Sequence, residues 1–311
     1  MDLSNSKNLK MTPCFEGILN LERLDFTGCI NLLQVHPSIG LLSELVFLSL
    51  QKCSSLVHLD FGSATRLWSL RILRLSGCTK LERAPDLTAA LNLEYLDVDR
   101  CTRLSSFRGS LIKLRVLSLR DCTNLVRLSE SLDKMTSLIT LDLCGCLKFK
   151  CLPIDSVMES LTFLDLSFCN ISVVPDAIGE LRGLERLNLQ GNNFTVLPSS
   201  LSCLHNLSYL NLSHCRRLEN LPSIPTNSGP SDSVGRYFKT TSGSRDHRSG
   251  LYVFDSLKMD ASLSRVRSPV YLQYKWLQRL LKVRTLPTFP SFSIPNICVF
   301  GDDTLLEFKC E

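Results

Sequence analysis

The chain has 311 residues, of which 44% are hydrophobic and 21% are charged, and its formal net charge is +5. This composition is typical of a globular protein and excludes a disordered or collagen-like chain. No stretch approaches the roughly 18 consecutive apolar residues of a membrane-spanning helix, and the first residues contain no apolar segment typical of a secretory signal. The sequence therefore predicts a cytoplasmic or nuclear protein that is not secreted.

One pattern of twelve residues recurs along the first two thirds of the chain. Its first complete copy is LERLDFTGCINL at residues 21–32, and a later copy is LEYLDVDRCTRL at residues 93–104. Both have the form LxxLxLxxCxxL, with Val98 as the third leucine-type residue of the later copy. The second leucine recurs at steps of 21 to 25 residues, from Leu24 to Leu210. This is the pattern and period of a leucine-rich repeat, in which a short strand points its leucines inward and a turn follows.

The repeats predict a solenoid over residues 1–222, with about ten repeats. Residues 1–20 match only the second half of the unit, so the first repeat is partial. A solenoid end without a polar cap exposes its leucines to water. We therefore expect the chain to be a fragment or a truncated form with an upstream neighbour.

The segments between the strands carry a second pattern. Residues 35–45, 174–184 and 197–207 each place a proline before apolar residues spaced three or four positions apart. Proline at the first helical position followed by this spacing predicts a short helix or helical turn on the outer side. The predicted fold class is therefore α/β, a leucine-rich-repeat horseshoe with a parallel sheet on its concave face.

The composition changes after the repeats. Residues 223–249 are rich in Ser, Thr and Gly, which predicts a flexible linker. Residues 250–311 predict a small, incomplete β-rich domain, with one amphipathic helix between Val270 and Val283. Eleven Lys and Arg against three Asp lie between Arg236 and Arg284. A run of charges is more often a solvated surface, so nucleic-acid or membrane contact by this basic tail, at Arg265 to Arg284, is kept as the less favoured alternative.

The chain has fourteen cysteines, and eight of them recur once per repeat at the turn position. In a solenoid, equivalent residues stack, and the turns contain backbone groups that must be satisfied without water. We therefore predict a row of buried, reduced thiols rather than disulfides or a metal site, with Asn192 in the same role in one repeat. No metal or other cofactor is expected. The predicted row consists of Cys29, Cys53, Cys78, Cys101, Cys122, Cys146, Cys169 and Cys215.

No catalytic motif is present, so the sequence predicts a protein that is not an enzyme. It contains no GxxxxGK phosphate loop, no GxSxG elbow and no HExxH zinc motif, and its five histidines are scattered. The candidate functional surface is instead the outward side of the strands, because residues that alternate with buried leucines face out.

Two columns of residues are predicted on this concave face. An exposed stripe of aromatic, aliphatic and Arg side chains commonly marks a protein-binding site, and an acidic column would favour a basic or mixed-charge partner. The alternative is that neighbouring columns pack sideways and cover one another. The first column is Arg23, Phe47, Ile72, Tyr95, Val116, Thr140, Phe163, Arg186 and Tyr209. The second contains Asp25, Asp97, Asp142 and Asp165, together with Ser49, Arg74, Ser118, Asn188 and Asn211.

The repeat pattern, together with HPSIG at residues 36–40 and the LPxxL connections, resembles the repeats of plant intracellular immune receptors. These are the TIR-class nucleotide-binding leucine-rich-repeat disease-resistance proteins, and the similarity covers residues 1–222. Residues 249–259, Trp276 and SIPNICVFGDD at residues 293–303 are similar to their post-repeat β-sandwich domain. The Ile-Pro-x-Trp-Phe segment of that domain departs here after Pro295.

The resemblance implies a recognition module that senses pathogen effectors, either directly or through a guarded host protein. It also implies contact with an upstream nucleotide-binding domain in a full-length receptor. Neither that domain nor the NAD-hydrolysing TIR domain is within these 311 residues. Two alternatives stay open: a generic intracellular repeat scaffold, and an extracellular receptor ectodomain, which is suggested by glycosylation sequons at Asn170, Asn193, Asn206 and Asn211.

Overall fold

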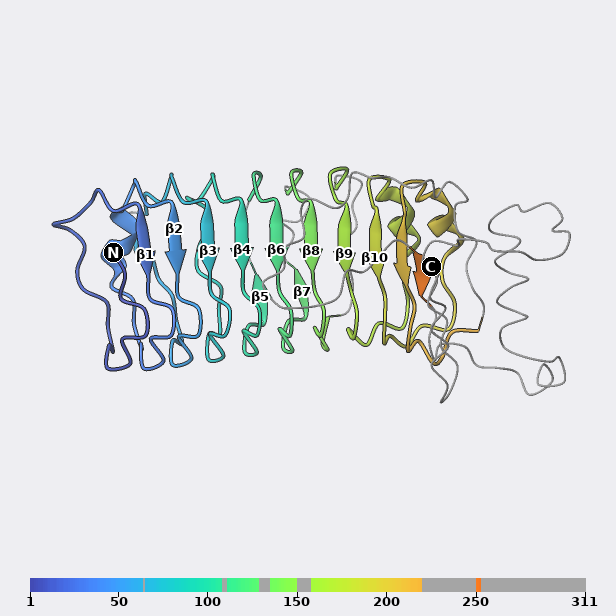
Figure 1. Cartoon of the computed structure of the whole chain (residues 1–311), viewed down its shortest axis with the longest axis horizontal. Coiled ribbons are helices and arrows are strands. Elements are labelled where there is room, and N and C mark those ends of the chain that lie inside the picture. The colour runs from blue at the N-terminus through green and yellow to red at the C-terminus, as the bar shows by residue number, and fades with distance from the viewer. Residues whose placement is uncertain (64, 108–110, 129–134, 150–157, 220–249, 253–311) are drawn as a thin grey trace, which may run out of the picture.

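Ten short parallel strands lie side by side in one sheet and follow the chain order (Figure 1). The structure is a computed structural model that describes residues 1–63, 65–107, 111–128, 135–149, 158–219 and 250–252. The leucine-rich-repeat solenoid predicted from the sequence is confirmed. The strands are β1 (Arg23–Asp25), β2 (Phe47–Ser49), β3 (Ile72–Arg74), β4 (Tyr95–Asp97), β6 (Val116–Ser118), β8 (Thr140–Asp142), β9 (Phe163–Asp165), β10 (Arg186–Asn188), β11 (Tyr209–Asn211) and β12 (Gly250–Tyr252).

The second leucine of each repeat sets the register of the sheet. Leu24 pairs with Leu48, and Leu48 pairs with Leu73, although the steps between them differ in length. All three leucines are fully buried. The connections therefore absorb the variation in repeat length, because a shift of one residue in a strand would turn its leucine from the core to the open face.

The connections contain short helical turns and one additional small sheet. Three 3-10 helices occur where the sequence predicts helical turns, and in the described residues no connection forms an α-helix. In the first of them, a Cβ on Gly40 would overlap the carbonyl oxygen of Phe61, which explains the glycine of the HPSIG motif. The helices are η1 (Pro37–Leu41), η3 (Asp176–Glu180) and η4 (Ser199–Cys203), and the small sheet pairs β5 (Ser106–Phe107) with β7 (Arg127–Leu128).

A left-handed residue follows each of the strands β1 to β11 in the ten-stranded sheet. Four positions after the second leucine, Gly77 has φ +79° and Phe168 has φ +54°. Glycine adopts this conformation without strain, whereas a residue with a Cβ pays roughly 1–2 kcal/mol. The turn is therefore imposed by the stacking of the repeats, even where the residue does not favour it.

The eight turn cysteines lie in one row across the solenoid. Each side chain is fully buried and free of disulfide bonds. Each thiol donates a hydrogen bond to a backbone carbonyl oxygen in the preceding repeat, at Sγ–O distances of 3.0 to 3.3 Å. For example, Cys101 donates to Leu75 and Cys122 donates to Val98. Burial raises the pKa of the Cys53 thiol to about 12, so the protonated donor form is favoured.

Asn192 occupies the cysteine position in the one complete repeat without a turn cysteine. Its Nδ2 donates to the carbonyl oxygens of Leu166 (2.8 Å) and Leu189 (2.9 Å). Its Oδ1 accepts from the amides of Cys169 (3.2 Å) and Ile171 (3.0 Å). Asparagine therefore performs the task of the thiol and satisfies further backbone groups of the neighbouring turn.

The last strand of the sheet comes from beyond the repeats. β12 pairs in parallel with β11, with Gly250 opposite Tyr209. From the sequence, this segment is predicted to begin the post-repeat domain. The predicted linker at residues 223–249 and the remaining residues 253–311, including the basic tail and the helix, lie outside the described residues. The division into three domains stays a prediction.

The row of thiols predicts a specific loss of stability when one donor is removed. Cys101→Ala removes the thiol, which is one of two donors to the buried carbonyl oxygen of Leu75, the other being the amide of Cys78 (3.1 Å), so the free energy of unfolding should fall by about 1–2 kcal/mol. Asn192→Ala should cost more, about 3 kcal/mol, because five hydrogen bonds are lost, one of them long (3.4 Å). Urea unfolding measures both values.

The control is Cys203→Ala, because Cys203 is exposed. This variant should stay within about 0.5 kcal/mol of the natural chain. Equal losses at Cys101 and Cys203 would contradict the assigned role of the buried thiols.

Candidate protein-binding face

Each of the strands β1 to β11 in the ten-stranded sheet presents two side chains on the face opposite the buried leucines. In β3, Leu73 is fully buried, while Ile72 and Arg74 on either side of it are partly exposed. The parallel register aligns the equivalent residues of neighbouring strands into two rows that run across the sheet. We call the row that contains Ile72 the first row and the row that contains Arg74 the second row.

Arg side chains cover the aromatic rings at both ends of the first row. The guanidinium carbon of Arg23 lies 3.7 Å from the ring centre of Phe47, and that of Arg186 lies 4.6 Å from the ring centre of Tyr209. Phe47 is only 8% exposed and Tyr209 only 5%. The expectation that the whole first row faces solvent therefore does not hold at these two residues, because cation–π stacking and sideways packing cover their rings.

The middle of the first row is more open. Ile72, Tyr95, Val116, Thr140 and Phe163 are all partly exposed and come from consecutive strands of the sheet. Burial of its ring raises the pKa of the Tyr95 hydroxyl, so this group stays neutral and can donate a hydrogen bond. The central strands therefore offer a mixed apolar surface with one phenolic donor. We call these five residues the central patch.

The carboxylates of the second row hold the turns that follow the strands. In each case, one oxygen accepts a hydrogen bond from the backbone amide two residues later. Asp97 Oδ1 accepts from Asp99 (3.1 Å), Asp142 Oδ1 accepts from Cys144 (3.1 Å) and Asp165 Oδ1 accepts from Ser167 (2.8 Å). Asp25 forms the same contact. These are Asx-type turn contacts, which give the acidic residues a structural role.

The second oxygen of each carboxylate contacts a side chain of the sheet face. Arg23 Nη2 lies 3.5 Å from Asp25 Oδ2, and Arg120 Nη1 lies 3.7 Å from Asp142 Oδ2. Amide groups serve the other two carboxylates, with Gln51 donating to Asp97 (3.1 Å) and Asn188 donating to Asp165 (2.9 Å). The four acidic residues are thus paired within the sheet.

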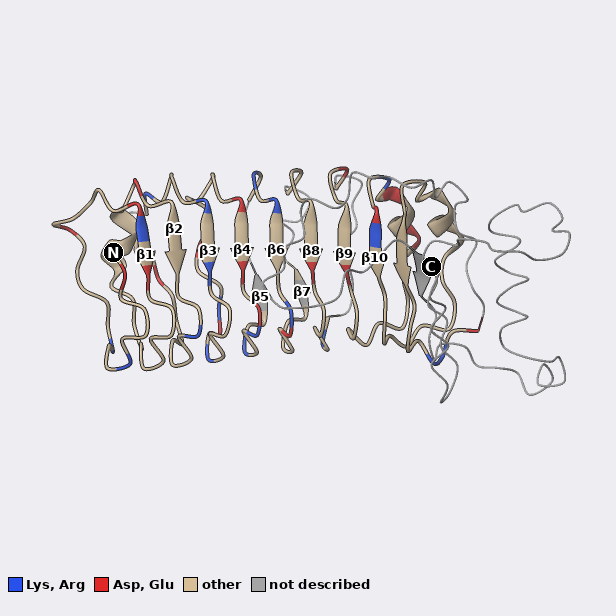
Figure 2. Cartoon of the chain, in the orientation of Figure 1, with Lys and Arg blue, Asp and Glu red and all other residues tan. Residues whose placement is uncertain are grey.

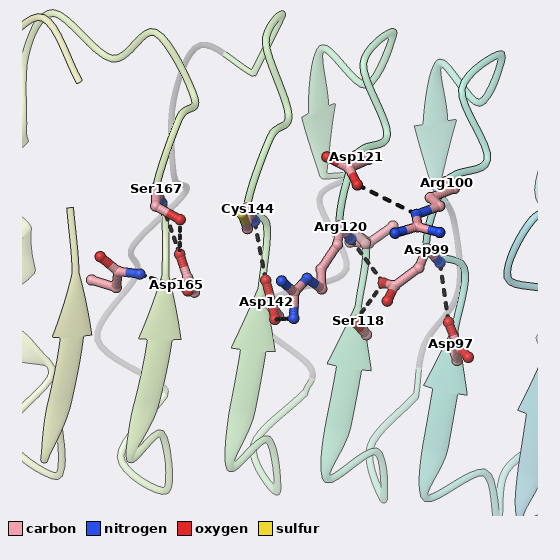
Figure 3. Close-up of polar contacts among 12 residues, drawn as sticks. Asp97, Asp99, Arg100, Ser118, Arg120, Asp121, Asp142, Cys144, Asp165 and Ser167 are labelled. Carbon is pink, nitrogen blue, oxygen red and sulfur yellow. Dashed lines mark hydrogen bonds and ion pairs between the residues drawn. The ribbon is translucent and has the colours of Figure 1, made fainter. Parts of the chain in front are cut away.

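Several charged residues lie around Arg120, next to the second row (Figure 3). The amide of Arg120 donates to Asp99 Oδ1 (2.9 Å), and its guanidinium faces Asp142. Burial, followed by the negative charge of Asp165, raises the pKa of Asp142 to about 7. Burial also raises the pKa of Asp99. This part of the face therefore changes its charge near neutral pH.

The sequence pattern did not indicate Asp99 or Arg120, and the acidic column was expected to be available to a partner. The signal that could have indicated the turn role is the repetition of Asp, Asn or Ser three residues before the left-handed residue in every repeat except that of Arg74. These are the residue types whose side chains cap local backbone amides. The signal for Asp99 is weaker, because its position is not acidic in most repeats.

The glycosylation sequons also have structural roles. Asn211 is 8% exposed, and its Nδ2 donates to Gln190 Oε1 (3.1 Å). Asn206 donates to the carbonyl oxygen of Arg182 (2.9 Å), and Asn193 donates to Asn170 Oδ1 (2.5 Å). Three of the four amides therefore serve as donors within the solenoid.

In the described part of the chain, no group of three His, Cys, Asp or Glu residues is arranged to hold a metal ion.

Family models match the repeats directly. The leucine-rich-repeat family matches residues 159–216, and a second leucine-rich-repeat model matches residues 206–228. Together with the parallel sheet and the inward leucines, these matches show that the chain belongs to the leucine-rich-repeat proteins. Among solved structures, a leucine-rich-repeat protein of Leptospira interrogans is 21% identical, with 68% of this chain and 69% of that chain covered and a TM-score of 0.37.

Several curated relatives of this leucine-rich-repeat chain are plant resistance proteins. TMV resistance protein N of Nicotiana glutinosa is 30% identical over 72% of this chain and 24% of that protein. The protein SUPPRESSOR OF npr1-1, CONSTITUTIVE 1 of Arabidopsis thaliana is 32% identical over 72% of this chain and 15% of that protein. Disease resistance protein RPS6 of Arabidopsis thaliana is 31% identical over 73% of this chain and 18% of that protein.

The repeats of this chain are similar to those of plant disease-resistance proteins, and the predicted resemblance to their TIR class is confirmed over the repeat region. It spans a quarter or less of the length of the three relatives named above. Within the described residues, no helix is long and apolar enough to cross a membrane.

The raised pKa of Asp142 predicts a pH-dependent stability. A carboxyl whose pKa is higher in the folded state than the ordinary 3.8 binds more protons when folded, so its ionisation lowers stability as pH rises from about 4 to about 8. Asp142→Asn removes this effect and keeps the turn acceptor, as Asn188 does for Gln190. Its free energy of unfolding should exceed that of the natural chain by about 1 kcal/mol or more at about pH 8.

Urea unfolding at several pH values measures this difference, which should shrink toward zero at about pH 4. Asp60→Asn is the control, because Asp60 is exposed and caps the amide of Gly62 in the same way. This variant should stay within about 0.5 kcal/mol of the natural chain at about pH 8, because the substitution lies on the exposed surface. A pH-independent difference for Asp142→Asn would contradict the role given to burial.

Proposed function

We propose that this chain is a non-enzymatic recognition module of a plant immune receptor. Its sheet face would bind a pathogen effector or a guarded host protein and so contribute to the defence response. The observation that carries the proposal is the central patch, because it combines partly exposed apolar groups with one phenolic donor on a rigid sheet. Aromatic groups of this kind are common anchors of protein interfaces.

Several relatives are named as resistance proteins, which supports a role of this chain in plant defence. We infer that the chain acts in the cytoplasm or nucleus and contacts a nucleotide-binding domain when it is part of a full-length receptor. Any nucleotide or NAD chemistry would then reside in that other domain and in the TIR domain. The repeats would contribute selectivity for the partner.

The two rows of the sheet face contribute differently to this proposal. The acidic residues of the second row form turn contacts and side-chain pairs. Substituting them would therefore disturb the fold as well as any interface. Phe47 and Tyr209 are buried, and truncating them would also act through stability. Tyr95 and Phe163 are partly exposed and are therefore the suitable residues for a test.

The test compares the natural chain with a Tyr95→Ala, Phe163→Ala double variant. Proteins captured from extracts of infected leaves are identified by mass spectrometry, purified, and titrated against both chains. The double variant should bind a true ligand about tenfold more weakly or worse, because two central anchors are lost.

The control is Val173→Ser with Val196→Ser, two exposed valines outside the strands. This variant should bind as the natural chain does. Undiminished binding by the Tyr95 and Phe163 variant would contradict the assignment of the sheet face.

A further inference from the structure

The turn that enters each strand has one exposed position. In this four-residue turn, the amide of the last residue donates to the carbonyl oxygen of the first, as in Leu70 to Leu67 (3.3 Å) and Leu114 to Leu111 (3.0 Å). The second residue of the turn is polar in five repeats, and it is large and apolar in the first repeat and in three consecutive later ones. From the first strand to the eleventh, this position is held by Leu19, Ser43, Trp68, Leu91, Ile112, Thr136, Glu159, Arg182 and His205.

We call Trp68, Leu91 and Ile112 the turn ridge. Their side chains are 55%, 52% and 47% exposed, respectively. Neighbouring strands lie about 4.8 Å apart, so the three residues form a row about 10 Å long. Single exposed apolar residues need no explanation, but a contiguous row rimmed by polar residues marks an interaction site.

The ridge is held in place by the turns on which it stands. The first and last residues of these turns, such as Leu67 and Leu93, are fully buried in the core. Asn92 Nδ2 donates to the carbonyl oxygen of Trp68 (2.6 Å), and Lys113 Nζ donates to Asn92 Oδ1 (2.7 Å). The three turns are therefore linked sideways, and the ridge side chains cannot withdraw into a core that is already filled.

The residues beside the ridge are mostly basic. Residues 65–71, 90–94 and 111–115 contain the four cations Arg66, Arg71, Lys113 and Arg115 and the one carboxylate Glu94, a net charge of +3. Glu94 pairs with Arg71 at 3.7 Å, and both side chains are well exposed. In Figure 2 the upper ends of β3 and β6 are blue and that of β4 is red, whereas red predominates at the lower ends of β4, β8 and β9.

We propose that the turn ridge binds an acidic amphipathic helix of another protein. Apolar residues at positions i, i+3 or i+4, and i+7 of a helix span about 10 Å, which matches the length of the ridge. Carboxylates beside this apolar stripe would meet the arginines and the lysine that flank the ridge. This surface lies at the starts of the strands and is separate from the central patch, so the inference goes beyond the proposed function.

The chain provides its own reporter for this contact. It has two tryptophans, Trp68 and Trp276. In a Trp276→Phe background, emission reports on Trp68 alone. The probe is a synthetic helical peptide of about 15 residues with a leucine stripe flanked by glutamates, and the same peptide with lysines in place of the glutamates is the comparison.

The acidic peptide should shift Trp68 emission to shorter wavelength and bind about tenfold or more tightly than the lysine peptide, with weaker binding at high salt. A Leu91→Ser, Ile112→Ser variant should lose about tenfold in affinity. Val173→Ser with Val196→Ser is the matched control and should bind normally, since these valines are 72% and 60% exposed but belong to other turns. Circular dichroism verifies the fold of each variant.

Equal binding of the acidic and lysine peptides, or equal loss in the valine control, would overturn the proposal. Self-association through the ridge without peptide binding, detected by sedimentation, would overturn it in favour of a second copy of the chain. Phe163→Ala should leave peptide binding unchanged. The proposal for the central patch and the proposal for the turn ridge are therefore tested by different variants, and either can fail without the other.

Discussion

The solenoid depends on satisfying the buried backbone of each turn without water. The carbonyl oxygen two residues after the second leucine is inside the structure, and the thiol of the next repeat donates to it, as Cys101 does to Leu75. The same oxygen also accepts the turn amide of its own repeat, as Leu75 does from Cys78 (3.1 Å), so the thiol adds a second hydrogen bond, worth about 1 kcal/mol, in repeat after repeat. Because the donor comes from the following repeat, each repeat completes its neighbour, and the stack rather than the single unit is the stable element.

The backbone groups of the turns also determine the role of the polar residues on the open face of the sheet. Asp97 and Asp165 direct one oxygen to the amide of the next turn and the other to a neighbouring side chain. The second row therefore serves the fold, whereas the middle of the first row, which includes Tyr95 and Phe163, makes up the central patch. The face combines a structural polar row with an apolar row that a partner can contact, and the starts of the strands carry a basic, apolar edge of different character.

The sequence predicted the parts of this arrangement that follow from periodicity. The spacing of Leu24, Leu48 and Leu73 indicated the strands and their register, and the helical turn after His36 followed from its proline. Periodicity gave no indication that Arg23 would stack on Phe47, because the approach of two long side chains on neighbouring strands depends on their rotamers. The ridge at Trp68 was also missed, because its turn position is not part of the leucine motif.

The sequence by itself determined which residues face the core, since alternation along a strand and a repeated leucine leave only one face that can be buried. Only the tertiary structure decided which outward residues are available to a partner, because exposure on a sheet depends on the neighbours contributed by adjacent repeats. Phe47 and Tyr95 occupy equivalent positions in the motif, yet Phe47 is covered more fully. The difference lies in the arginines, since Arg23 lies 3.7 Å from the ring of Phe47 and the nearest guanidinium to Tyr95, that of Arg74, lies 5.6 Å away.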